Sequence, residues 1–298
     1  MLKLTLTALA LAVVICVPRA TARAAEESGE VPFSFEKGFV IVPAKIKGKG
    51  DVEVVISTGA EFSTVDGGAT LKYKLQLYYT GVPPITGRND RTISFSQVPD
   101  VQVGPAVESL SMRLGSTAHL SDAVGREIFG VLGNDFLKGR TVQFDFAKKV
   151  LRFLDKPAAE ALRTKAAAAG AVLRMGEKEN EFRQTLTLPL VEKVMFNDKP
   201  AKVLFDTGIS TVIALSSSTA KKLGLETPPE KGNARTDTVK QLRLGTSELS
   251  DVPVTILAKG SKAEAQLGDG GALVGSVLLQ NFVATFDYRG KVVILERF

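Results

Sequence analysis

Short runs in which apolar and polar residues alternate recur along most of the chain. Residues 51–56 read Asp-Val-Glu-Val-Val-Ile, and residues 185–188 read Thr-Leu-Thr-Leu. A period of two is typical of a β-strand with one buried face. Residues 150–154 and 292–295 are rich in β-branched and other apolar side chains, and they predict one more strand near the end of each half of the chain. The pattern therefore predicts a mainly β protein.

Helical signals are fewer. Residues 216–223 begin with serines, which suit a helix N-cap, and Gly224 follows where that helix should end. Residues 157–170 begin with proline, are filled with alanine and end with glycine, which predicts a helix between the two halves. The predicted fold class is therefore all-β with short helices.

Four landmarks occur twice in the same order, which indicates an internal duplication. The sequence Val-Ile-Ser-Thr-Gly-Ala at residues 55–60 corresponds to Leu-Phe-Asp-Thr-Gly-Ile at residues 204–209, 149 positions later. Three further landmarks follow at offsets of 141, 142 and 142 positions, and such nearly constant spacing is hard to obtain by chance. These pairs are residues 101–104 with 242–245, 131–133 with 273–275, and 144–146 with 286–288.

In each copy a predicted strand ends in two apolar residues, and Ser-Thr-Gly (first copy) or Asp-Thr-Gly (second copy) comes directly after them. Later in each copy an apolar-apolar-Gly sequence is followed by two more predicted strands. This arrangement resembles the aspartic proteases of the retropepsin and pepsin group. It occurs twice, and the two copies together cover nearly the whole chain after its N-terminal apolar segment. The resemblance implies two β-rich lobes related by an approximate twofold axis. Together with the N-terminal apolar run and the alanine-rich segment between the copies, it predicts a signal peptide at residues 1–24, a first lobe at 25–155, a helical and polar linker at 156–180, and a second lobe at 181–298.

The resemblance also implies the site residues and their chemistry. In this family two neighbouring carboxyl groups share one proton and hold the attacking water between them. The second copy keeps this carboxylate as Asp206, whereas the first copy has Ser57 at the equivalent position. A serine hydroxyl cannot share a proton in this way. The resemblance implies that Asp206 is the catalytic residue and faces Ser57 across the axis. It also implies that the two threonines connect the loops. The residues that would support the site are Thr207, Gly208, Ser57, Thr58 and Gly59.

Other positions also depart from the family pattern. Retropepsins often place an arginine after the second glycine, where it braces an acid that follows the Asp-Thr-Gly-Ala. In this sequence Asn134 and Ser276 take that place, while Glu61 is the acid of the first copy. The turn-rich residues 81–91 of the first copy are candidates for a flap over the substrate, and the second copy is shorter there.

Three hypotheses about function follow from the resemblance. The default is an aspartic endopeptidase that cleaves peptides through Asp206, active as a homodimer that brings two copies of this residue together. The second is a single-chain pseudoprotease that binds extended peptides between its lobes without cutting them. The third is a structural module of the cell envelope. The first two require a peptide or protein as the partner.

Composition restricts other chemistries. Cys16 is the only cysteine and lies in the N-terminal apolar segment, so neither a disulfide nor a cysteine metal site is expected in the mature chain. No spacing of metal ligands is present, and no metal or cofactor is expected. His119 is the only histidine and has no Gly-x-Ser-x-Gly around it, so we expect an exposed loop residue rather than a member of a serine triad.

The first residues are typical of a signal peptide. Lys3 is followed by the mostly apolar residues 4–17, then by Pro18 and the small residues around Ala24. The apolar run is shorter than the roughly 20 residues of a membrane-spanning helix. We therefore expect export to the periplasm or beyond, with no integral membrane segment after cleavage; the alternative is an uncleaved anchor. Cleavage removes three basic residues and lowers the net charge from +6 to +3, with no basic block typical of nucleic-acid binding.

The signal-peptide interpretation predicts the N-terminus of the mature protein. The exported protein should begin at Ala25 or close to it, because the small residues before it suit signal peptidase. N-terminal sequencing of the exported form measures this directly. A soluble cytoplasmic form that retains Met1 would contradict the interpretation.

Overall fold

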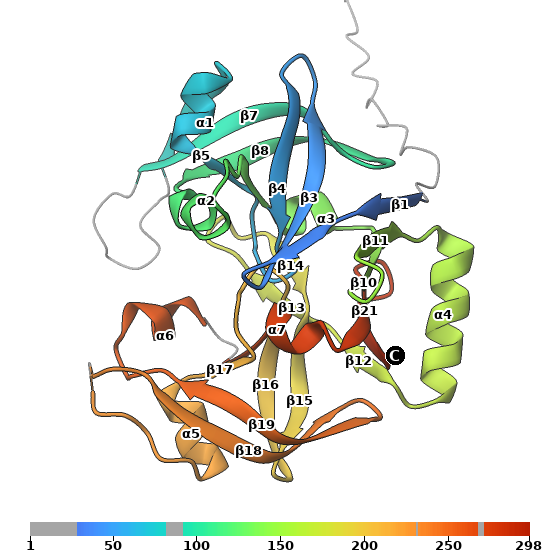
Figure 1. The fold of residues 1–298 in the computed structure, drawn as a ribbon, viewed down its shortest axis with the longest axis vertical. Helices are drawn as coiled ribbons and strands as arrows, with labels where there is room; N and C mark the ends of the chain where they lie inside the picture. Colours follow the sequence, from blue (N-terminus) through green and yellow to red (C-terminus); the bar gives the residue numbers. More distant parts are fainter. Residues whose placement is uncertain (1–28, 82–91, 231, 268–270) are drawn as a thin grey trace, which may run out of the picture.

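The computed structural model describes residues 29–81, 92–230, 232–267 and 271–298, and shows two β-rich lobes joined by a shared sheet (Figure 1). The predicted signal peptide and residues 82–91 of the predicted flap lie outside the described residues. Within the described part of the chain, no helix is long and apolar enough to span a membrane. The predicted all-β, two-lobed fold is confirmed.

The first lobe is a ring of six strands in the order β3-β4-β9-β5-β8-β7, closed by the pairing of β3 with β7. Strands β2 and β6 extend the sheet at its two ends. The strands are β2 (Ser34–Glu36), β3 (Phe39–Ile46), β4 (Gly50–Ile56), β5 (Thr64–Asp66), β6 (Gln76–Gly81), β7 (Thr92–Val103), β8 (Ala106–Gly115) and β9 (Gly130–Leu132). The helices are α1 (Gly67–Lys72), α2 (Ala118–Val124) and α3 (Asn134–Leu137).

The second lobe is a closed barrel in the order β15-β16-β20-β17-β19-β18, so each strand has a counterpart at the same place in the first ring. The strands are β15 (Leu190–Phe196), β16 (Lys199–Asp206), β17 (Ile213–Leu215), β18 (Arg235–Leu244), β19 (Ser247–Ile256) and β20 (Ala272–Gly275). The helices are α5 (Ser217–Leu223), α6 (Lys262–Gln266) and α7 (Ser276–Leu279). Helix α5 begins after the side-chain cap of Ser216 and ends at Gly224 in the left-handed conformation, as its sequence predicts.

The alternating pattern produces these barrels because one side of each strand faces a core. In β4 the side chains of Val52, Val54 and Ile56 are buried, while Asp51 is exposed. The repeated Gly104 and Gly245 lie in the turns between β7 and β8 and between β18 and β19, with φ of +56° and +61°. Only glycine adopts this conformation without strain, which explains why this landmark occurs in both halves.

The closing strands of the two halves form one shared sheet, which the sequence did not predict. Its order is β1-β11-β10-β21-β22-β12, and the central antiparallel pair joins β10 from the first half to β21 from the second. Helix α4 (Lys156–Ala168) connects β11 to β12 and packs beside this sheet (Figure 1). The strands are β1 (Gly29–Pro32), β10 (Thr141–Asp145), β11 (Val150–Phe153), β12 (Val172–Arg174), β21 (Phe282–Asp287) and β22 (Val292–Arg297).

Between β12 and β15 the chain forms a separate hairpin, β13 (Gly176–Glu179) and β14 (Thr185–Leu188). Its two strands form a sheet of their own outside both barrels. The sequence predicted a polar linker up to residue 180 and a strand after it, but not this pairing. The hairpin contributes to the surroundings of the site described below.

The shared sheet depends on Asp287, which leads to a stability prediction. Its carboxylate is 1% exposed and accepts hydrogen bonds from Thr141 Oγ1 at 2.7 Å and from Arg163 Nη1 at 2.5 Å. Asp287→Ala leaves both donors without their acceptor and should lower the free energy of unfolding by about 3 kcal/mol. Urea denaturation at neutral pH measures this loss. The exposed Asp122→Ala is the control, and a loss as small as that of the control would contradict this role.

Candidate active site between the lobes

The Ser-Thr-Gly segment follows directly on β4, and the Asp-Thr-Gly segment begins with Asp206, the last residue of β16; the two strand ends meet at the centre of the molecule. In each lobe the strand that precedes the loop runs parallel to the strand carrying the apolar-apolar-Gly: Ile56 lies opposite Leu132, and Asp206 lies opposite Gly275. The two landmarks of each half are therefore adjacent because of strand pairing. This pairing places each loop at the edge of its barrel.

Thr58 and Thr207 bind the two loops to each other reciprocally. Thr58 Oγ1 donates to the carbonyl of Phe205 at 3.0 Å, and Thr207 Oγ1 donates to the carbonyl of Ile56 at 2.7 Å. Each hydroxyl also accepts from the main-chain N–H of the other threonine, at 3.1 and 3.3 Å. Both side chains are fully buried. The two loops therefore form one unit within a single chain.

Ser57 and Asp206 face each other at the centre of this unit. Ser57 Oγ donates to Asp206 Oδ1 at 2.7 Å, and the same oxygen accepts from Gly208 N at 2.8 Å. A Cβ on Gly208 would lie 2.4 Å from the Cβ of Ser57, and a Cβ on Gly59 would lie 2.9 Å from Asp206. The glycines are needed because the two loops approach so closely. One hydroxyl and one carboxyl therefore face each other at the centre of the site.

Burial is the main influence on the pKa of Asp206. The side chain is 5% exposed, and burial raises the pKa of its carboxyl above the ordinary value. Hydrogen bonds from Gly208 N, the Ser57 hydroxyl and Gly59 N oppose this rise in pKa because they favour the charged form. Asp206 is therefore a buried acid whose protonation depends on a few fixed donors rather than on a second carboxyl.

Tyr288 is a site residue that the motif analysis missed. Its buried hydroxyl donates a hydrogen bond to the carbonyl of Thr58 at 2.9 Å and so helps to fix the position of the Ser-Thr-Gly loop. Burial first, and the nearby Asp206 charge second, raise the pKa of this phenol well above its usual range. The equivalent residue of the first half is Phe146, which has no hydroxyl. This difference at a repeated landmark is the sequence signal that could have identified it.

The residues that replace the family arginine have contacts of their own. Asn134 Nδ2 donates to the carbonyl of Thr187 at 2.6 Å, and Ser276 Oγ donates to the carbonyl of Gly38. Thr187 lies 149 positions after Gly38, and Ser276 lies 142 positions after Asn134. Both spacings match the offsets between the repeated landmarks, so the two contacts are equivalent in the two halves. Each connects one lobe with the segment that leads into the other barrel.

Glu61 has a cationic partner that the sequence did not predict. Lys178 on β13 lies 2.9 Å from its carboxylate, where the family pattern would supply an arginine. Glu61 therefore lies beside the loop and is neutralised by the hairpin, and it is not directed at Ser57. The ion pair links the hairpin β13–β14 to the first lobe.

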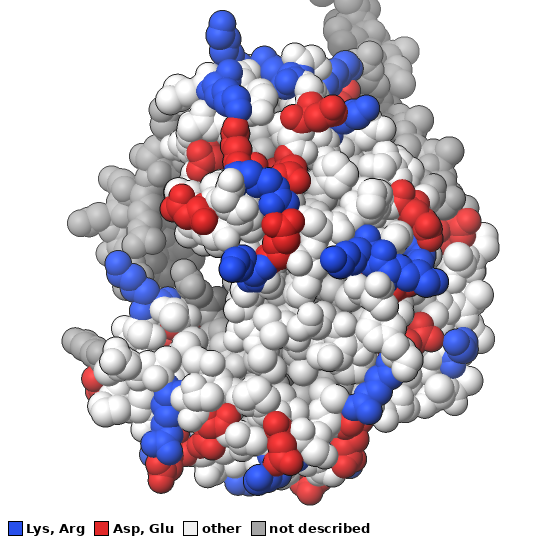
Figure 2. Space-filling model, in the orientation of Figure 1, with Lys and Arg blue, Asp and Glu red and all other residues white. Residues whose placement is uncertain are grey.

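Two other candidates lie away from the centre. His119 is exposed, as expected, but it lies on α2 and not in the predicted loop. Among the described residues, no three His, Cys, Asp or Glu side chains gather as metal ligands would. On the face shown in Figure 2, basic and acidic side chains are interspersed, and the area between the lobes is largely uncharged.

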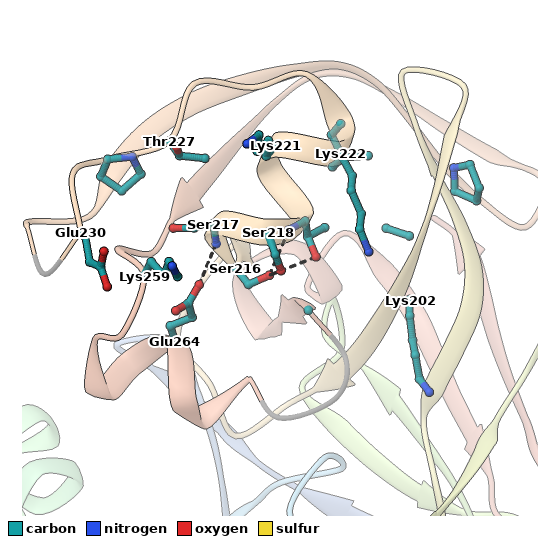
Figure 3. A pocket seen from close by; sticks show the side chains of 16 residues that line it. Lys202, Ser216, Ser217, Ser218, Lys221, Lys222, Thr227, Glu230, Lys259 and Glu264 are labelled. Atoms are coloured by element: carbon teal, nitrogen blue, oxygen red, sulfur yellow. Dashed lines mark hydrogen bonds between the residues drawn. The ribbon is translucent and has the colours of Figure 1, made fainter.

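A pocket of about 980 Å³ lies in the second lobe, at the start of α5 (Figure 3). Lys202 and Lys222 line it, and Glu264 accepts hydrogen bonds from Ser217 N at 2.9 Å and from Gly260 N at 2.8 Å. These main-chain donors are therefore already satisfied within the protein. Its lining residues do not include the two loops, so this pocket is separate from the candidate site around Asp206.

The barrels, the shared sheet and the joined loops define a two-lobed, retropepsin-like acid-protease architecture with an asymmetric centre. Consistent with this class, a family model described as aspartyl protease matches residues 192–270, a range that includes Asp206, Thr207 and Gly208. A comparison with curated proteins gave no match. The match supports an aspartic-protease-like domain in the second half, whereas the likeness of the first half rests on its strand order and loop geometry.

The raised pKa of Asp206 predicts a pH-dependent difference in stability between wild type and Asp206→Asn. A raised pKa means that folding favours the protonated form, so this contribution is complete below about pH 3.9, the ordinary value of an unfolded aspartic acid. It is lost as the pH rises through the higher folded-state value, whereas asparagine does not titrate. The free energy of unfolding of wild type, relative to the variant, should therefore fall between acidic and neutral pH.

Urea denaturation of both proteins at a series of pH values measures this difference. The exposed Asp122→Asn serves as the matched control and should show a nearly constant difference from wild type. If wild type instead gained stability over Asp206→Asn with rising pH, the carboxyl would have a lowered pKa, contrary to the burial described above.

Proposed function

We propose that this protein is an exported, aspartic-endopeptidase-like protein that binds extended peptides between its lobes, with Asp206 as its catalytic carboxyl and with weak hydrolysis. The observation that carries the proposal is the 2.7 Å hydrogen bond from Ser57 Oγ to Asp206 Oδ1. The family match and the two-lobed fold support the peptide as ligand. The signal-like residues 1–24 support the location outside the cytoplasm.

The weak activity follows from the missing partner. In a carboxyl pair the charged member takes a proton from water, while the protonated member donates to the peptide carbonyl. An ionised Asp206 can act as the base, but Ser57 is too weak an acid to supply a proton to the carbonyl near neutral or acidic pH. A positioned acid or base contributes roughly 10²–10⁴-fold to the rate. The absence of one such group should reduce hydrolysis by a similar factor.

The reciprocal threonine contacts favour a cleft made by one chain over the homodimer hypothesis. Thr58 and Thr207 already satisfy each other within the monomer. A dimer through two second lobes would first have to break these buried contacts. We further propose that the two halves descend from one duplicated unit; the nearly constant sequence offsets and the matching strand orders support this.

A change at Ser57 tests the proposal. Ser57→Asp restores two facing carboxyls and should raise peptide cleavage at acidic pH by about 10²–10⁴-fold over wild type. The increase should be confined to acidic pH, because one of the two carboxyls must stay protonated. The measurement is the rate at which each variant cleaves an unfolded protein substrate, determined at a series of dilutions of the variant.

Two controls sharpen the test. Ser57→Ala removes the hydroxyl without adding an acid and should not increase cleavage, whereas Asp206→Asn should abolish what cleavage there is. Strong, dilution-independent cleavage by wild type, inhibited by pepstatin and unchanged in Ser57→Asp, would refute the proposed role of the site. Strong cleavage that falls steeply on dilution would instead support the homodimer.

A further inference from the structure

The hairpin β13–β14 has an ordered shape of its own. Its strands pair in register from Gly176 with Leu188 to Glu179 with Thr185. The turn is fixed by Asn180, whose Oδ1 accepts from the main-chain N–H groups of Phe182 and Gln184, both at 2.9 Å. The hairpin therefore presents a defined surface rather than a loose linker.

Aromatic contacts dock this hairpin on the first lobe. The rings of Phe182 and Phe62 pack edge to face with their centroids 5.5 Å apart, and the centroid of the Phe182 ring lies 5.8 Å from that of Phe95 on β7. Phe62 follows the Ser-Thr-Gly-Ala segment by two residues, so the docking surface adjoins the loop that carries Ser57. Phe95 belongs to the strand that pairs with β6 on the way to the predicted flap. The hairpin thus covers the side of the site next to these elements.

Charged and polar contacts reinforce the docking. Lys178 pairs with Glu61 at 2.9 Å, and Glu181 pairs with Arg113 on β8 at 3.0 Å. The hairpin is also joined to the lobe where Asn134 donates to the carbonyl of Thr187. The contacts extend from the base of the hairpin to its tip.

The second-lobe side of the site has a much smaller structure at the equivalent place. There Ser276 contacts Gly38, in the tight turn between β2 and β3, and Ser210 Oγ donates to the carbonyl of Lys37 at 2.6 Å. Ser210 is the counterpart of Glu61 by the internal offset of 149 positions. A short turn thus stands on one side of the site, and a docked hairpin stands on the other.

We propose that the hairpin β13–β14 closes the first-lobe end of the peptide cleft, so that a peptide terminus lies against it. This inference rests on the proposed function, since it concerns the length of the bound peptide. An extended peptide over Ser57 and Asp206 passes Glu61 and Phe62 on one side and Ser210 on the other. In this proposal Phe182, whose ring packs against that of Phe62, stops the peptide on the first-lobe side. The cleft therefore accepts long extensions at the second-lobe end alone.

Peptide extensions test this asymmetry. Random octapeptides are selected for binding to wild type, and one core peptide is then extended by Gly-Ser-Gly-Ser at its N-terminus or at its C-terminus. One extension should weaken binding to wild type by about tenfold, which corresponds to a lost subsite contact, and the other should leave it nearly unchanged. Fluorescence anisotropy of the labelled peptides gives the dissociation constants.

Two variants assign the effect to the hairpin. Replacing residues 179–185 by Asn-Gly keeps the Lys178–Leu186 pair and a turn suited to a two-residue hairpin, but it removes Glu181 and Phe182. This variant should bind both extended peptides about equally. The milder Phe182→Ala weakens the docking without shortening the chain and should relieve the tenfold loss in part, to about threefold. Phe298→Ala, at an exposed aromatic residue outside the hairpin, should leave the asymmetry unchanged.

The outcomes separate this inference from the proposed function. If wild type tolerates both extensions equally, or if the asymmetry persists unchanged in both hairpin variants, the inference is wrong while peptide binding stands. If no octapeptide binds wild type or Ser57→Asp, the proposed function fails and the inference fails with it.

Discussion

The reciprocal hydrogen bonds of Thr58 and Thr207 determine where the two barrels meet, and the other features of the centre follow from that contact. Each hydroxyl both donates to and accepts from the opposite loop, so neither loop can shift without leaving buried polar groups unsatisfied. The shared sheet also joins the two halves of the chain, through the pairing of β10 with β21. Together they bring Ser57 against Asp206, and they demand glycine at positions 59 and 208.

On this nearly symmetric scaffold the chemistry is asymmetric. One loop carries a carboxyl and the other a hydroxyl, and Tyr288 supports the Ser-Thr-Gly loop where the opposite half has Phe146. The surroundings differ as well, since a docked hairpin lies on one side of the site and a tight turn on the other. A scaffold with these interlobe contacts and a single carboxyl at its centre suits binding and slow chemistry at one acid, as we propose.

The sequence predicted the features that depend on local pattern and on repetition. Alternation at residues 51–56 predicted a half-buried strand, and the serines at residues 216–218 with Gly224 predicted α5. The shared sheet, the docking of Phe182 and the contacts of Asn134 and Ser276 were missed. They join residues far apart in the chain, and no local pattern encodes such partners. Ser57 and Asp206 were expected to face each other because of a family resemblance, and not because of any property of the two residues alone.

One chain forms a site with a single carboxyl, and this can be tested through the titration of Asp206. The ¹³C chemical shift of this carboxyl, assigned by comparison with Asp206→Asn, can be followed by NMR over pH. We expect one single-step titration with a pKa above the ordinary value of aspartic acid, independent of protein concentration. Two coupled steps, which indicate a second carboxyl sharing the proton, or a midpoint that changes on dilution would contradict it.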